Sequence, residues 1–379
     1  MQLAPMLAND GSGEVFRRFY ISRTWAHNAR LHAHSSISTA YEMAMSLMQE
    51  TLVFSPTLQT QHFRLVDALR ESEGLPSDYA SFQIESNRHK QAVETLERGR
   101  ALLWSEMRGL RTSIDQLHAA DPALADKFAA INRKLELVTT SVAQSESEEM
   151  GDSETGTGRH EGMDSIGSLV AMQRRLLEER NFLISHIQSL HGLENFLRPL
   201  SFDVLNSAAV HGPVIIVNQS QWRSDIVILR KDLPSSVIST SSDFHDRANE
   251  LKDRLLRART EKGLESEDYG HTLASVLVDL YELVGKPVIE RLRELKIPEK
   301  SRVWWCPTSA FCSLPLHAMG PIPSDDSDEL YFMDLYIPSY TSTLSALIES
   351  QKPRSMGRDR GHTSRQDAGD NSRFENGNA

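Results

Sequence analysis

Apolar residues recur at every third or fourth position through the first half of the chain, from about Glu14 to Leu190. This spacing places them along one face of an α-helix, whereas the alternation typical of strands is nearly absent there. We therefore expect helices that bury one stripe and pack in antiparallel pairs. The first pair is predicted within residues 23–52, with a break at Ser35 and Ser36.

Turn-forming residues divide the remainder of this region into further helices. The Gly74–Ser77 segment interrupts one helix, because glycine and proline do not continue a helix cheaply. Asp121 is a predicted N-cap, followed by Pro122 at the first helical position. Helices are predicted at about 57–70, 122–138 and 169–190. A further helix is predicted to start near Asp78, and one long helix to cover 89–117.

The segment 141–167 differs in composition from the helices on either side of it. Ser, Glu, Gly and Asp dominate it, and Arg159 is its only Lys or Arg. The small apolar surface of this segment cannot offset the conformational entropy lost on ordering it. We therefore expect a disordered acidic loop. Its stretch from Glu146 to Asp164 is either a solvated insertion or a docking site for a basic partner.

The second half of the chain has a different pattern. Short continuous apolar runs rich in β-branched residues predict buried strands at 213–217, 225–229 and 303–306. Helices are expected between them at about 243–259, 271–284 and 288–295, with Gly285 as a C-cap and Pro287 opening the last one. Strands interleaved with helices predict an α/β domain that begins near Leu200.

Charge and composition exclude several classes of function. The formal net charge is −11, which opposes binding to a nucleic-acid backbone. No apolar run approaches the roughly 20 residues of a membrane-spanning helix, and the first residues do not resemble a secretory signal. The two cysteines, Cys306 and Cys312, provide no disulfide framework and no zinc-ligand spacing. We expect a soluble protein of the cytoplasm or the nucleus, without cofactor or metal.

Three motifs, in this order, resemble the fungal CHAT-domain proteins, in which a caspase-like domain is associated with tetratricopeptide repeats. They are the stretch LERGRALLW at 96–104, the stretch VWWCPT at 303–308 continued by LPLHAMG at 314–320, and the stretch IPSYTSTL at 337–344. The similarity covers roughly residues 25–350. It implies tetratricopeptide-like helices for residues 1–199, although no period of about 34 residues can be counted.

The same resemblance implies a caspase-type dyad, in which a histidine takes the proton of a cysteine thiol. A free thiol with a pKa near ~8.5 needs this help at neutral pH. In the family both residues follow the serine-tyrosine-threonine stretch, and this chain has no cysteine after Ser339. We therefore predict the leading part of a CHAT domain at 200–351, a disordered tail at 352–379, and no catalytic residue.

Several residues could still suggest chemistry. Cys306 or Cys312 with His317 could form a makeshift pair, although closeness in sequence does not establish hydrogen-bond geometry. The pair His211-Gly212 looks like the family's His-Gly pair but precedes the first strand, so a turn is the favoured interpretation.

Two features of the helical region also have alternative interpretations. His27, His32 and His34 form a cluster that is either packing and surface or a metal site. Arg100 interrupts an apolar stripe, so it either pairs with a carboxylate, lies along the surface, or contacts a partner. No phosphate-binding glycine loop is present.

Three hypotheses for function follow. The first is a CHAT-domain-containing protein, non-catalytic in this form, whose helical region binds a protein partner. The alternative is an incomplete gene model of an active caspase-like cysteine peptidase, whose His/Cys dyad lies beyond the C-terminus. A third is a purely helical scaffold with an accidental resemblance to an α/β domain.

Overall fold

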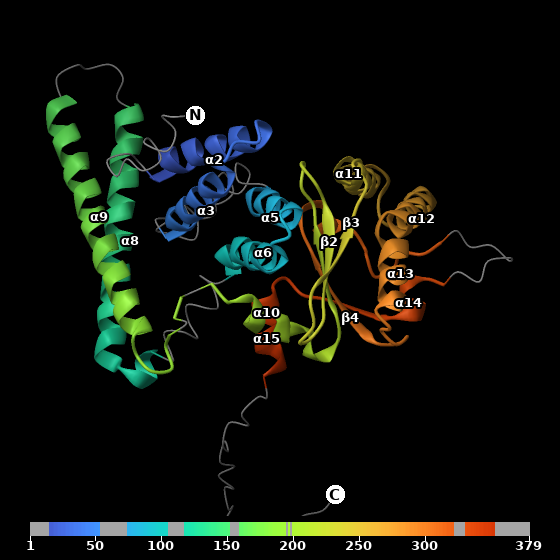
Figure 1. Cartoon of the computed structure of the whole chain (residues 1–379). Helices are drawn as coiled ribbons and strands as arrows, with labels where there is room; N and C mark the ends of the chain where they lie inside the picture. Colours follow the sequence, from blue (N-terminus) through green and yellow to red (C-terminus); the bar gives the residue numbers. More distant parts are fainter. Residues whose placement is uncertain are drawn as a thin grey trace, which may run out of the picture.

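The structure is a computed structural model in which a sheet has helices on both faces and a long helical hairpin stands to one side (Figure 1). It describes residues 15–53, 74–104, 117–151, 159–194, 196–197, 199–321 and 330–352. The predicted helix at 57–70, the second half of the one predicted at 89–117 and almost all of the predicted tail lie outside these residues.

Two helical hairpins form the layer nearest the N-terminus. The first joins α2 (Val15–Leu31) to α3 (Ile37–Val53), and the second joins α5 (Leu75–Glu85) to α6 (His89–Trp104). The break between α2 and α3 lies at 32–36, as the Ser35-Ser36 pair predicts. Buried alanines such as Ala29, Ala40 and Ala44 let α2 and α3 approach closely.

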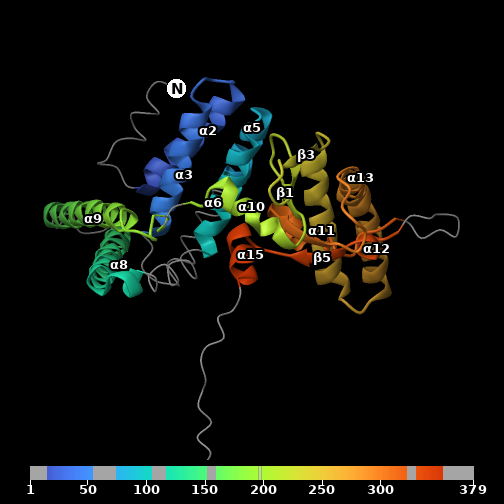
Figure 2. The same cartoon turned by 60° about the horizontal axis from the view of Figure 1, so that its bottom comes forward.

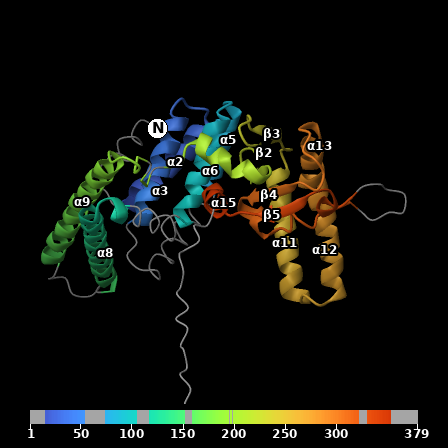
Figure 3. The same ribbon diagram turned by 90° about the horizontal axis from the view of Figure 1, so that it is seen from below.

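The third hairpin consists of α8 (Pro122–Gly151) and α9 (Arg159–Gln188) and stands apart from the rest of the chain (Figures 1 and 3). It has its own core around Phe128, Leu135 and Ile187. Asp121 caps α8 as predicted, since its Oδ1 accepts a hydrogen bond of 2.9 Å from the Leu124 amide.

The expectation of a disordered loop over 141–167 is wrong for most of that segment. Helix α8 continues to Gly151 and α9 begins at Arg159. Residues 152–158 lie outside the described residues. Helices in proteins depend mainly on packing of the whole helix, so the described core of α8 and α9 can extend them beyond the apolar stripe that the sequence shows.

Five strands form one mixed sheet in the C-terminal half. They are β1 (Val214–Asn218), β2 (Asp225–Leu229), β3 (Ser236–Ser239), β4 (Arg302–Pro307) and β5 (Ile337–Tyr340). The order is β3-β2-β1-β4-β5, with antiparallel pairing from β3 to β1 and parallel pairing from β1 to β5. This sheet rules out the purely helical scaffold. Strands β3 and β5 were not predicted, and β5 is formed by the start of the IPSYTSTL stretch itself.

Both faces of the sheet are covered, which explains why β1 is apolar from Val214 to Val217. Val214 and Ile216 pack with α5, α6, α10 (Phe202–Asn206) and α15 (Leu344–Gln351). Ile215 and Val217 pack on the opposite face. There the sheet meets α11 (Phe244–Lys262), α12 (Glu267–Leu280), α13 (Lys286–Glu294) and α14 (Phe332–Leu335). Figure 2 shows α10 and α15 on one side of the strands and α11 to α13 on the other.

The predicted C-cap at Gly285 is wrong. Its φ of −62° and ψ of −56° are right-handed helical values, and a π-helical turn over Tyr281–Gly285 joins α12 directly to α13. A Cβ at Gly285 would lie 2.8 Å from the Tyr281 ring, so this glycine permits close packing instead of ending the helix.

The core of the sheet crosses the boundary that the sequence predicts near residue 200. Ala80, Ile84, Val93 and Leu96 of α5 and α6 belong to the same buried cluster as β1 and β2. The second helical hairpin is therefore one of the layers of the α/β sandwich. No helix in the described part of the chain combines the length and the apolar character needed to cross a membrane.

Candidate functional site

Cys306 lies at the end of β4, on the face of the sheet that α6 covers. Its side chain has no exposed surface. Arg100 of α6 donates one hydrogen bond from Nη1 to the Cys306 Sγ and another of 3.0 Å from Nη2 to the Cys306 carbonyl oxygen. The charged interruption of the α6 stripe therefore bonds a strand, and not the carboxylate between helices that the sequence suggested.

The environment of both thiols is unfavourable for nucleophilic attack. Burial raises the pKa of Cys306 to about 11, and the Arg100 guanidinium opposes this only in part. Cys312 is exposed, yet partial desolvation of its sulfur also raises its pKa. Reactive cysteines are those with a lowered pKa, so neither thiol is activated.

His317 does not serve either cysteine. Its Nδ1 lies 3.0 Å from the Tyr340 hydroxyl, and its backbone amide donates to the same oxygen at 3.0 Å. Cys312 Sγ instead donates to the Pro307 carbonyl at 3.4 Å. Within the described residues no histidine forms a hydrogen bond with a cysteine, so the makeshift pair is not assembled.

The motif at 97–100 joins α6 to four other elements. Glu97 is buried, and its carboxylate accepts hydrogen bonds from the amides of Leu344 and Ser345 at 2.9 Å each and from the Ser345 hydroxyl. These groups form the N-terminus of α15, where a negative charge is favourable. Arg98 donates to Glu42 and to Gln49 on α3, at 3.3 and 2.7 Å.

Gly99 completes this junction because it allows α5 and α6 to touch. A Cβ at this position would lie 2.3 Å from the Pro76 Cγ, closer than any real contact. With Arg100 on β4, the four consecutive residues therefore connect α6 to α15, α3, α5 and the sheet. The first motif of the family resemblance is a structural junction in this fold.

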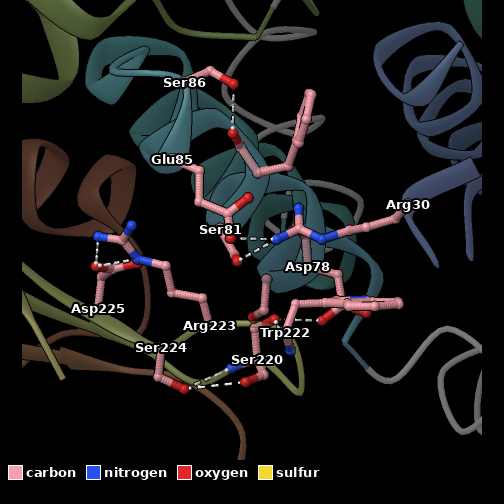
Figure 4. A network of polar contacts seen from close by, with 12 residues as sticks. Arg30, Asp78, Ser81, Glu85, Ser86, Ser220, Trp222, Arg223, Ser224 and Asp225 are labelled. Carbon is pink, nitrogen blue, oxygen red and sulfur yellow. Dashed lines mark hydrogen bonds and ion pairs between the residues drawn. The ribbon is translucent and has the colours of Figure 1, made fainter. Parts of the chain in front are cut away.

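A second junction lies at the carboxyl end of β1, where α2 and α5 meet the following loop (Figure 4). Asp78 of α5 is 8% exposed. Its Oδ1 accepts from the Ser220 hydroxyl at 2.7 Å and its Oδ2 from the Gln221 amide at 3.1 Å. Burial raises the pKa of Asp78, although both hydrogen bonds oppose the shift.

Arg30 of α2 fixes the same junction from the other side. Its guanidinium pairs with Glu85 at 2.7 Å, and it lies 5.5 Å from the Phe82 ring centre and 5.4 Å from that of Trp222. Figure 4 shows Arg30 reaching from α2 toward Ser81 and Glu85 on α5. A cation that is flanked by two rings and paired with a carboxylate holds α2 against α5 and the β1–β2 loop.

The other histidines considered as candidates contact neighbouring side chains or lie in turns. The His27 ring packs on Trp222 at 5.3 Å between centroids, His32 lies exposed in the turn after α2, and His34 Nδ1 is 2.8 Å from the Ser36 hydroxyl. His211-Gly212 forms the predicted turn into β1. Gly212 has a φ of 134°, and a Cβ there would lie 2.1 Å from the Arg302 carbonyl. The described residues contain no group of three or more potential metal ligands.

Sequence reasoning missed Glu97, Arg30 and Asp78. Glu97 follows Leu96 and begins a run of four charged or glycine residues, and this run is the sequence feature that could have indicated a functional role for it. Arg30 and Asp78 carry no such signal, because their partners lie far away along the chain.

In comparison with known proteins, no protein-family model and no curated protein matches the chain.

Proposed function

We propose that this chain is the helical region and leading α/β part of a CHAT-type, caspase-like protein, and that it acts by binding other proteins and not through its own thiols. The observation that carries the proposal is the environment of Cys306. This cysteine lies near the end of the parallel strand β4, where it is fully buried and hydrogen-bonded to Arg100. Its role is to hold α6 on the sheet.

The helical hairpins support the binding part of the proposal. Large apolar side chains are exposed on α8 and α9, with Leu137 at 69% and Phe182 at 71%. The hairpin has its own core and does not depend on the sheet for burial. Stacked helical hairpins of this kind commonly present extended binding surfaces.

A thiol-directed peptidase probe tests the proposal. The purified chain is expected to show no labelling by an acyloxymethyl-ketone probe and no cleavage of a peptide library. Cys312→Ser and His317→Ala serve as matched controls. Labelling that both substitutions abolish would show that the chain carries its own dyad and would refute the proposal.

An active peptidase is the second candidate function, and the edge of the sheet favours it. Strand β5 is the last strand on its side of the described sheet, and the amides of Ile337 and of Thr341, the residue after β5, donate to the carbonyls of Ser301 and Trp305. A further parallel strand carrying the dyad would join the opposite edge of β5. Sequencing the transcript beyond the codon for Ser350 distinguishes the two, since this candidate requires a downstream frame that encodes a strand, a His-Gly pair and a later cysteine.

A further inference from the structure

A small cavity lies among α2, α3, α5 and the loop after β1, next to the junction of Figure 4. Its volume is about 240 Å³. Tyr20, Thr24 and His27 line its exposed side, and the buried residues Tyr41 and Asp78 line its interior. Pockets for drug-sized ligands have volumes of about 300–1,000 Å³, so this one suits a single side chain or a small molecule.

Asp78 is the chemically distinctive group in this cavity. Its carboxylate is 8% exposed and is bonded by two neutral donors, the hydroxyl of Ser220 and the amide of Gln221. Within the described residues it forms no ion pair. The neighbouring Arg30 pairs with Glu85 and donates to the main-chain oxygen of Asp78, so its charge acts on the Asp78 carboxylate without a direct hydrogen bond. A buried carboxylate without a cation is costly, and each of its oxygens still has an unused lone pair.

The rest of the lining also suits a cation. Tyr20, His27 and Tyr41 contribute aromatic rings, whose faces attract ammonium groups. Tyr20 is 58% exposed, so a ligand could reach its ring from solvent. Arg23 is the exception, because this half-buried cationic residue also lines the cavity and would favour an anion instead.

We propose that this cavity binds a primary alkylammonium group, carried either by a lysine side chain of another protein or by a free aliphatic amine, with Asp78 as its counter-ion. The inference does not depend on the function proposed above. Labelling of the chain by the thiol-directed probe and binding of an amine in the cavity are measured separately, so either proposal can fail alone.

Isothermal titration of the full chain tests it with n-pentylamine, and with 1-pentanol as a neutral ligand of the same shape. The amine is expected to bind saturably and the alcohol not to bind. Asp78→Asn should weaken amine binding by about 10- to 100-fold, the range for a hydrogen bond to a charged group. Asp243→Asn, which changes an exposed carboxylate elsewhere, should leave it unchanged.

Two further arms sharpen the result. Arg23→Gln should maintain or strengthen amine binding, whereas an anion site would lose its ligand. Nα-acetyl-lysine methylamide and cadaverine then separate the two sources of the ammonium group, and binding of either supports the site. Equal binding of alcohol and amine, loss of amine binding in Arg23→Gln, or no effect of Asp78→Asn would overturn the proposal.

Asp78→Asn could disturb folding, so a surface variant is included. Tyr20→Ala changes only an exposed ring and should weaken amine binding about two- to fivefold. Circular dichroism verifies that both variants are folded. If Asp78→Asn unfolds and Tyr20→Ala binds the amine as tightly as the unaltered chain, the assignment is wrong.

Discussion

Replacing Glu97 with alanine tests whether α6 holds the end of the described fold in place. Glu97 is 5% exposed and accepts hydrogen bonds from the Leu344 and Ser345 amides at 2.9 Å each. In Glu97→Ala the fully buried Leu344 amide loses its partner, at about 1–3 kcal/mol. The half-buried Ser345 can partly recover water, so the free energy of unfolding should fall by about 2–4 kcal/mol in total.

Urea denaturation followed by circular dichroism measures this loss. Glu97→Gln retains an acceptor but not the charge, so it should fall between the unaltered chain and Glu97→Ala. Glu290→Ala is the matched control, because it removes an exposed helical glutamate and should change stability by less than about 0.5 kcal/mol.

Hydrogen exchange locates the effect. In Glu97→Ala the amides of residues 341–351 should exchange faster, since α15 loses its N-terminal acceptor while the sheet retains its own hydrogen bonds. If Glu97→Ala is as stable as Glu290→Ala, and exchange in α15 is unchanged, the capping role of Glu97 is refuted.

Three further outcomes are expected. In the native chain Cys312 should react with iodoacetamide far faster than Cys306, whose pKa is raised to about 11 by burial; peptide mapping after a timed pulse measures this, and equal rates would contradict the burial of Cys306. Burial raises the pKa of Asp78 above its ordinary value of 3.8, so its contribution to stability should be greatest below pH 3.8 and should decline as pH rises through the folded-state pKa. The stability difference between the unaltered chain and Asp78→Asn should follow that decline in urea titrations over this range, and a difference independent of pH would contradict it. Gly99→Ala should destabilise the chain by about 1–3 kcal/mol, because the added Cβ overlaps Pro76. A melting temperature equal to or above that of the unaltered chain would show that α5 and α6 can move apart without cost.

Local pattern in the sequence was enough to determine most helices and the three central strands. The three- and four-residue spacing predicted the α2–α3 pair, and the Asp121-Pro122 pair located the start of α8. The runs at 213–217, 225–229 and 303–306 are apolar at nearly every position because both faces of the sheet are covered. These features depend on residues close together in sequence, so the pattern alone reveals them.

Only the tertiary structure decided the remaining features, because each depends on residues far apart in the chain. Strand β3 has only two apolar residues between two serines, and β5 contains Pro338, so neither has a clear strand pattern, and each forms by pairing with a buried neighbour. Arg100 bonds a cysteine 206 positions away, and Glu97 caps a helix 247 positions away. Asp78 lies in the cavity only because α5 packs against the end of β1. Hydrophobic spacing determines where elements form, but the partner of a buried charge is determined by the way the elements pack.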